Sequence, residues 1–97
     1  MKLRYTLPAL ADLNSILDYI AEFSPQGAAR VQRRIEHMID LLLDHPHIGM
    51  RTDDPTIRRL TTAPYPFLVY YEVAEMEIII HAIRHATRDP ADRPGSP

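Results

Sequence analysis

The chain has 97 residues, of which 45% are apolar and 25% charged, and it contains no cysteine. This composition predicts a single folded domain and excludes a disordered chain, a disulfide scaffold and a cysteine-ligated metal site. With 11 basic and 13 acidic residues the net charge is -2, which argues against a protein that grips RNA or DNA through many phosphates.

Membrane and export signals are also lacking. No apolar run approaches the roughly 20 residues that cross a bilayer. The first residues, Met1–Tyr5, contain no apolar stretch typical of a signal peptide. We therefore expect a cytoplasmic protein that makes no membrane contact.

A short strand and two helices are predicted in the first half of the chain. Residues 2–5 form the strand, and Thr6 caps a helix over residues 7–23. Ser24 caps a second helix over residues 25–44, with a proline in its first turn. Because the break between the two helices is short, they should form an antiparallel hairpin.

The apolar residues of both helices recur at the three- to four-residue spacing of an amphipathic helix. They are Leu10, Leu13, Ile16, Leu17 and Ile20 in the first helix, and Ala28, Val31, Ile35, Met38, Ile39 and Leu42 in the second. Asp12, Asn14, Asp18 and Glu22 fall on the other side of the first helix. The arginine cluster Arg30, Arg33 and Arg34 is interpreted as a solvated face of the second.

Three strands are predicted after Thr56, where the apolar period changes to two. They cover Ile57–Thr62, Phe67–Val73 and Glu77–Ile83, separated by turns at residues 63–66 and 74–76. The predicted fold class is therefore α+β: an N-terminal strand, a helical hairpin and a three-stranded antiparallel meander, with both helices on one face of the sheet. Residues 1–89 should form the single domain. Residues 90–97, rich in proline, should form a loose tail.

The strand parity predicts which side chains line the sheet face that the helices leave open. Glu77, Ile79, His81 and Ile83 alternate with Ile78, Ile80 and Ala82, and the set with charge and histidine is the better candidate for the open face. The expected open face contains Leu68, Tyr70, Glu72, Ile79 and His81. Leu41 lies well off the buried stripe of its helix and should add to an exposed, partly apolar surface that a partner covers.

Several segments, taken in order, resemble the ParE/RelE toxin superfamily over roughly residues 2–90. The resemblance is carried by Ala11-Asp12-Leu13-x-x-Ile16-x-x-Tyr19-Ile20, Leu42-x-x-x-Pro46-x-x-Gly49, Arg59-Leu60, Pro66-Phe67-Leu68-Val69-Tyr70-Tyr71-Glu72-Val73 and Ile83-Arg84-His85-Ala86-Thr87-Arg88-Asp89. It implies the toxin of a type II toxin–antitoxin pair, held by an antitoxin encoded beside it. RelE-like members cut mRNA on the ribosome, whereas ParE-like members poison DNA gyrase.

The residues favour the ParE-like branch. In RelE-type nucleases an arginine stands at the position that matches Leu68, and a histidine and a tyrosine stand where this chain has Ala86 and Thr87. A leucine cannot neutralise the charge that develops on phosphate. We therefore expect no catalytic residues, although Arg84, His85 and Arg88 are the candidates if the chain is a nuclease.

The partner-binding residues expected on this interpretation are Leu41, Leu68, Tyr70, Ile79, His81 and Arg88. The partners are an antitoxin and DNA gyrase, without sequence-specific binding of nucleic acid. A ribosome-dependent mRNA endoribonuclease and a non-toxic binding module with the same fold remain as alternatives. No cofactor is expected. The loop His45-Pro46-His47 lacks the ligand spacing of a zinc site, so no metal is expected either.

Overall fold

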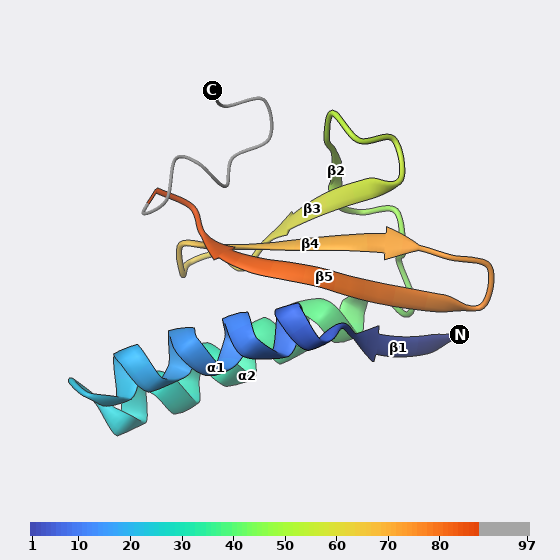
Figure 1. Ribbon diagram of the computed structural model, residues 1–97. Coiled ribbons are helices and arrows are strands. Elements are labelled where there is room, and N and C mark those ends of the chain that lie inside the picture. The colour runs from blue at the N-terminus through green and yellow to red at the C-terminus, as the bar shows by residue number, and fades with distance from the viewer. Residues whose placement is uncertain (88–97) are drawn as a thin grey trace.

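The computed structural model describes residues 1–87 and shows a helical hairpin packed on one face of a five-stranded sheet (Figure 1). The elements in chain order are β1 (Lys2–Tyr5), α1 (Leu7–Ala21), α2 (Pro25–Leu41), β2 (Met50–Arg51), β3 (Ile57–Thr61), β4 (Phe67–Val73) and β5 (Glu77–His85). The predicted α+β class is confirmed. The tail predicted over residues 90–97 lies outside the described residues, so the domain boundary stays a prediction.

The strand order is β1-β5-β4-β3-β2. β3, β4 and β5 form the predicted antiparallel meander, and β1 runs parallel to β5 at the sheet edge. The two-residue strand β2 beside β3 was not predicted. Neither helix of residues 1–87 is long and apolar enough to cross a bilayer.

Both helices begin where their capping residues predict. The Thr6 hydroxyl accepts a hydrogen bond from the Ala9 backbone N–H at 3.2 Å, and the Ser24 hydroxyl accepts one from Gly27 at 2.9 Å. Each bond satisfies one backbone donor that the first helical turn leaves without a partner. The helices end two to three residues earlier than predicted, at Ala21 and Leu41.

The core lies between the helices and the sheet. Its fully buried side chains include Ile35 and Ile39 of α2, with Val69, Tyr71 and Ile80 of the two central strands. Burying an aliphatic or aromatic side chain of this size contributes about 1.5–3 kcal/mol. The core therefore holds the sheet rigidly and leaves its other face to solvent or to a partner.

Tyr71 also fixes the loop that follows α2. Its hydroxyl donates a hydrogen bond to the Pro46 carbonyl at 2.8 Å and accepts one from the Gly49 N–H at 2.9 Å. A Cβ at Gly49 would lie 2.6 Å from the Tyr71 hydroxyl oxygen, so only glycine fits at this close approach. Burial raises the pKa of Tyr71, which keeps the hydroxyl protonated and able to donate.

A β-bulge divides β5 into two halves. Tyr70 pairs with Ala82, but Tyr71 pairs with Ile80, so His81 is the additional residue. The inserted residue reverses the parity of the strand beyond it. The prediction that Ile83 shares the open face is therefore wrong: Ile83 is only 1% exposed and belongs to the core, while Ala82 takes the open-face position.

Candidate functional site

The open sheet face is organised in three cross-strand rows. The register aligns Thr61 with Leu68 and Arg84, Arg59 with Tyr70 and Ala82, and Ile57 with Glu72, Ile79 and Arg4. Residues that pair across a sheet point to the same side of it. The predicted positions Leu68, Tyr70, Glu72 and Ile79 therefore do share one face, at its centre.

Two of these predicted surface residues are buried. Tyr70 is 8% exposed and Ile79 is 7% exposed, so the expectation that they offer accessible apolar area is wrong. Both stand on the central strands, and the register places an arginine beside each: Arg59 next to Tyr70 and Arg4 next to Ile79. Arginine stems can lie along apolar surface while their heads stay in water, so each arginine stands where its stem can cover its neighbour.

Leu68 and His81 are partly exposed, as expected for an open face. His81 stands at the bulge, where its Nε2 atom lies 2.8 Å from Oε1 of Glu72. Leu41 does not join them, because it lies at the end of α2 in the helical layer on the other side of the sheet (Figure 1). Arg88 lies outside the described residues.

Sequence reasoning missed Arg59 as a cation of the open face. Its strand pairs it with Tyr70, and its Nη2 atom lies 3.9 Å from the Met50 sulfur. Its Nε atom is buried without a hydrogen-bond partner within residues 1–87. Alternation from Ile57 along β3 places Arg59 on the same side as Thr61, which was the signal available in the sequence.

Arg84 is held at the edge of the sheet by Asp12 of α1. The Asp12 carboxylate accepts a hydrogen bond from Arg84 Nη1 at 2.9 Å and a second from the Ile83 backbone N–H at 3.0 Å. The β1 pairing ends at Ile80, so Asp12 substitutes for the missing strand at Ile83. The expectation that Asp12 lies on the solvent side of its helix is wrong: its side chain is only 17% exposed.

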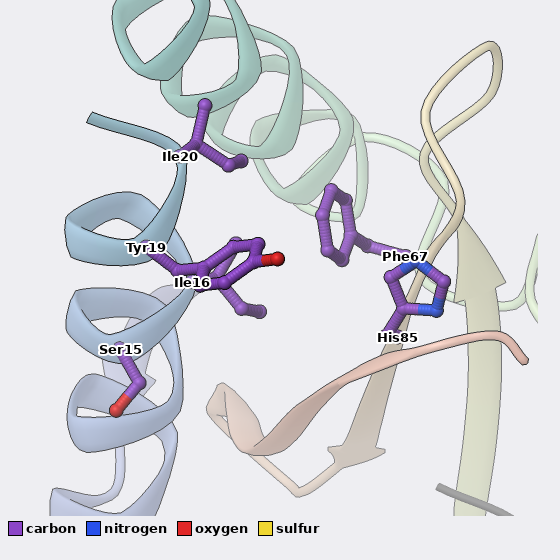
Figure 2. Close-up of a pocket in the computed structure, with 6 residues that line it drawn as sticks. All are labelled: Ser15, Ile16, Tyr19, Ile20, Phe67 and His85. Atoms are coloured by element: carbon purple, nitrogen blue, oxygen red, sulfur yellow. The ribbon is translucent and has the colours of Figure 1, made fainter. Parts of the chain in front are cut away.

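His85 lies on the helix side of the sheet, because it pairs with Phe67. Its ring meets the Phe67 ring edge-on at a centroid distance of 5.5 Å, and its Nδ1 atom accepts the Thr87 N–H at 3.2 Å. The two rings line a mostly apolar hollow of about 370 Å³. Figure 2 shows the opposite wall, formed by Ile16, Tyr19 and Ile20 of α1.

The aromatic surface continues beyond this hollow. Tyr19 packs edge-on against Phe23 with ring centroids 5.3 Å apart, and Phe23 is 75% exposed. Large aromatic side chains in water are typical of surfaces that another protein covers. This end of α1 is therefore an apolar surface that was not predicted as part of the partner-binding site.

The described candidates for a nuclease site do not converge. The Arg84 guanidinium is paired with a carboxylate, and the His85 ring lies on the other side of the sheet, against Phe67. General acid–base work on a phosphodiester needs a base, a proton donor and a cation around one reacting group. Among residues 1–87 no group of three or more histidine, aspartate or glutamate side chains is placed to hold a metal.

The sequence of this chain matches known proteins over most of its length. Residues 3–90 match the family described as "ParE toxin of type II toxin-antitoxin system, parDE". The chain is 42% identical to "Toxin RelE2" of Caulobacter vibrioides over 84 residues, which covers 87% of this chain and 93% of the relative. It is 33% identical to "Putative toxin Y4kP" of Sinorhizobium fredii, covering 88% of each.

A solved structure agrees with the sequence comparisons. This structure, "Chromosomal ParDE TA system from P. aeruginosa", superposes with a TM-score of 0.77 at 30% identity, covering 88% of this chain and 95% of the other. The helical hairpin on a meander sheet therefore defines a toxin of the type II toxin–antitoxin class. Within that class, the chain belongs to the ParE toxin family.

Proposed function

We propose that this toxin inhibits DNA gyrase and that a cognate antitoxin holds it inactive in the cytoplasm. The observation that carries the proposal is the row of the open face in which Leu68 stands opposite Arg84, whose guanidinium is paired with Asp12. An apolar side chain and a neutralised guanidinium favour a surface that binds a protein over one that stabilises a phosphorane. Removing a single donor to an oxyanion typically costs a factor of about 10² to 10³ in rate.

The antitoxin part of the proposal is supported by surface that the isolated chain exposes. Phe23 packs on Tyr19, which lines the apolar hollow near the end of α1, and Leu7 is 80% exposed at the start of this helix. A partner that buries such surface stabilises the toxin by about 25 cal/mol for each Å² of apolar area, before ordering costs. The similar solved structure from P. aeruginosa is of a ParDE system, which is consistent with an antitoxin partner.

The residues proposed to contact partners are Leu41, Leu68, Tyr70, Ile79, His81 and Arg88. Leu68 and His81 are accessible for direct contact, while Tyr70 and Ile79 shape the face from beneath. Because Leu41 lies in the helical layer, one partner touching both regions must pass around the edge of the sheet. A partner that wraps in this way is an extended segment rather than a compact domain.

A ribosome-dependent endoribonuclease is the second candidate function. It is favoured by Arg59, whose guanidinium is on the open face beside Tyr70, and by the name RelE2 that the Caulobacter relative carries. On this alternative Arg59, and not the residue at position 68, would supply the charge that stabilises the cleaved phosphate. Arg59→Gln is therefore the variant that tests it.

Two assays on the purified protein separate these functions. We expect inhibition of gyrase supercoiling, and no cleavage of mRNA on programmed ribosomes at comparable concentrations. His85→Ala should leave gyrase inhibition intact, since its ring packs on Phe67 away from the open face. Ribosome-dependent cleavage that Arg59→Gln, His85→Ala or Arg88→Ala abolishes would overturn the gyrase proposal.

Expression of the chain alone in growing bacteria provides the cellular counterpart. DNA breaks with an SOS response are expected from a gyrase poison, whereas rapid loss of mRNA is expected from a nuclease. Unchanged growth with soluble, folded protein would favour the non-toxic binding module. Co-expression with the protein encoded beside it should restore growth and raise the melting temperature of the toxin.

A further inference from the structure

One edge of α2 carries a stripe of basic side chains, Arg30, Arg33, Arg34 and His37, which we call the basic stripe. At 100° per residue these four positions fall within an arc of about 100° that faces away from the buried side of the helix. Pro64 and Tyr65, in the turn between β3 and β4, complete the wall of an open hollow of about 510 Å³.

The arginines of the basic stripe form no ion pair with any residue in the described range 1–87. Arg34 donates from Nε to the Ala63 carbonyl at 2.7 Å, which orients its guanidinium beside the turn. By contrast, Arg4 and Arg84 are each paired with a carboxylate of this chain, Glu77 and Asp12. The positive charge of the basic stripe is therefore left for an external anion.

The carboxylates of α2 border the basic stripe on one side only. Glu36 and Asp40 face β1, where they act with burial to raise the pKa of Tyr5 to about 12, burial being the larger cause. Glu36 also accepts a hydrogen bond from Gln32 at 3.2 Å. By the same 100° step, Asp40 lies about 20° and Glu36 about 60° from Arg33, so the acids border the basic stripe on that side, while Arg30 and Arg34, on the side of the turn, have no carboxylate of α2 beside them.

The turn beside the basic stripe is held in place before any ligand arrives. The buried Thr62 hydroxyl lies 3.3 Å from the Tyr65 carbonyl, and the Tyr65 N–H donates to the Thr62 carbonyl at 3.1 Å. With Arg34 attached to the same turn, one arginine and the backbone that carries Tyr65 are oriented in advance. A preorganised site loses less entropy on binding.

We propose that the basic stripe binds a short acidic peptide segment of a partner protein, which under the proposed function is the antitoxin. Peptide carboxylates pair with the free guanidiniums of Arg30 and Arg33 and with the oriented one of Arg34. The planar guanidinium matches a carboxylate with two parallel hydrogen bonds, which adds geometric selectivity to the charge attraction.

The dimensions of the basic stripe favour a peptide over nucleic acid. From Arg30 to His37 the helix rises only about 10 Å. Duplex DNA carries a negative charge every 1.7 Å or so, and a strand running on past the stripe would meet the carboxylates of Asp40 and Asp44. A segment with a few carboxylates fits the same length without that repulsion. The net charge of -2 gives no general attraction for a polyanion.

Fluorescence anisotropy with the full chain tests the proposal. The probes are a labelled peptide of alternating glutamate and alanine, the same peptide with glutamine in place of glutamate, and a short duplex DNA. The test variant is Arg30→Gln/Arg33→Gln. The matched control, Lys2→Gln/Arg51→Gln, also removes two exposed positive charges but leaves the basic stripe intact. Thermal unfolding of both variants checks that the fold is retained.

We expect the glutamate peptide to bind and the glutamine peptide to bind far more weakly. The affinity for the glutamate peptide should fall by about 2- to 30-fold in Arg30→Gln/Arg33→Gln, as for the loss of two exposed charge pairs, and stay near wild type in the control. Equal binding by both variants would overturn the proposal, and so would tighter binding of DNA than of peptide. Gyrase inhibition is measured separately, so a failure here leaves the proposed target untouched.

Discussion

Removing the Tyr71 hydroxyl should destabilise the toxin strongly, because this one group forms two hydrogen bonds that hold the loop after α2. In Tyr71→Phe the buried Gly49 N–H loses its acceptor, and the Pro46 carbonyl loses its donor. A buried donor left without a partner costs about 1–3 kcal/mol, while the half-exposed Pro46 carbonyl can regain a water. We expect a loss of about 2 kcal/mol, which lowers the melting temperature of a domain this small by about 8–16 °C.

Urea unfolding followed by circular dichroism measures this loss, and Tyr70→Phe is the matched control. Tyr70 is the neighbouring tyrosine, 8% exposed where Tyr71 is 0% exposed, and its hydroxyl has no hydrogen-bond partner in the described residues. Tyr70→Phe should therefore change the free energy of unfolding by less than about 0.5 kcal/mol. Equal stabilities for the two variants would show that the Tyr71 bonds do not hold the loop.

Gly49→Ala provides a second route to the same contact. The added Cβ would lie 2.6 Å from the Tyr71 hydroxyl oxygen, 2.7 Å from its ring carbon Cε1 and 3.0 Å from the Arg59 carbonyl oxygen. Neither a fully buried ring nor strand backbone moves away without cost, so a loss of about 1–3 kcal/mol is expected. A displaced Tyr71 ring would break the same hydrogen bonds that Tyr71→Phe removes. The double variant Tyr71→Phe/Gly49→Ala should therefore lose less free energy of unfolding than the two single variants lose together.

Three further changes follow from individual contacts. Asp12→Ala should cost about 1–3 kcal/mol in urea unfolding, because the Ile83 N–H loses its acceptor at the strand edge, and a change below about 0.5 kcal/mol would contradict this. The raised pKa of Tyr5 favours its neutral form in the folded protein, so its contribution to stability is present below pH 10 and is lost as the pH rises towards 12. Tyr5→Phe should therefore make the free energy of unfolding depend less on pH in this alkaline range. The Arg4 guanidinium lowers the pKa of Glu77, so the pair contributes to stability above the ordinary glutamate pKa, and this contribution is lost as the pH falls through the lowered value. Glu77→Gln should therefore reduce the acid dependence of the free energy of unfolding, measured at successive pH values.

The helices and the meander were predictable because their signals are local. Thr6 and Ser24 each precede a proline and an amphipathic pattern, and both cap the helices as expected. The helix ends were predicted too late, since the apolar spacing continues through Leu42, which is buried although it lies beyond the last helical residue. The spacing of apolar residues indicates which side chains are buried, and buried side chains continue past the last hydrogen-bonded residue of the helix.

The open face was predicted only in part, because a one-residue bulge leaves no mark in the pattern. Up to Ile80 the alternation of β5 is correct, and beyond His81 it is reversed. Ile83 and Ala82 were therefore assigned to the wrong sides. Whether an additional residue is accommodated depends on the partner strand, which parity counted along one strand does not include.

The contacts between distant segments were not accessible to sequence reasoning. Asp12 and Ile83 are 71 positions apart and meet only because β1 ends before β5 does. The two-residue strand β2 pairs with β3 directly after Gly49, whose N–H is held by the Tyr71 hydroxyl from another strand. Both depend on where elements stop in three dimensions, and neither has a local periodic signal.

The Asp12–Arg84 pair bears directly on how the family pattern is interpreted in this chain. Arg84 was a candidate catalytic cation, and Ala11-Asp12-Leu13 was one of the segments that carried the family resemblance. The structure joins the two: Asp12 binds the Arg84 guanidinium and the Ile83 backbone with the same carboxylate. A cation used to fasten a helix to a strand edge is unavailable to stabilise charge on a phosphate unless the fastening is broken. The same residues that carry the family resemblance therefore weaken the case for catalysis. Among residues 1–87, Arg59 is the open-face arginine without a carboxylate partner, and a nuclease activity of the described part of the chain would depend on it.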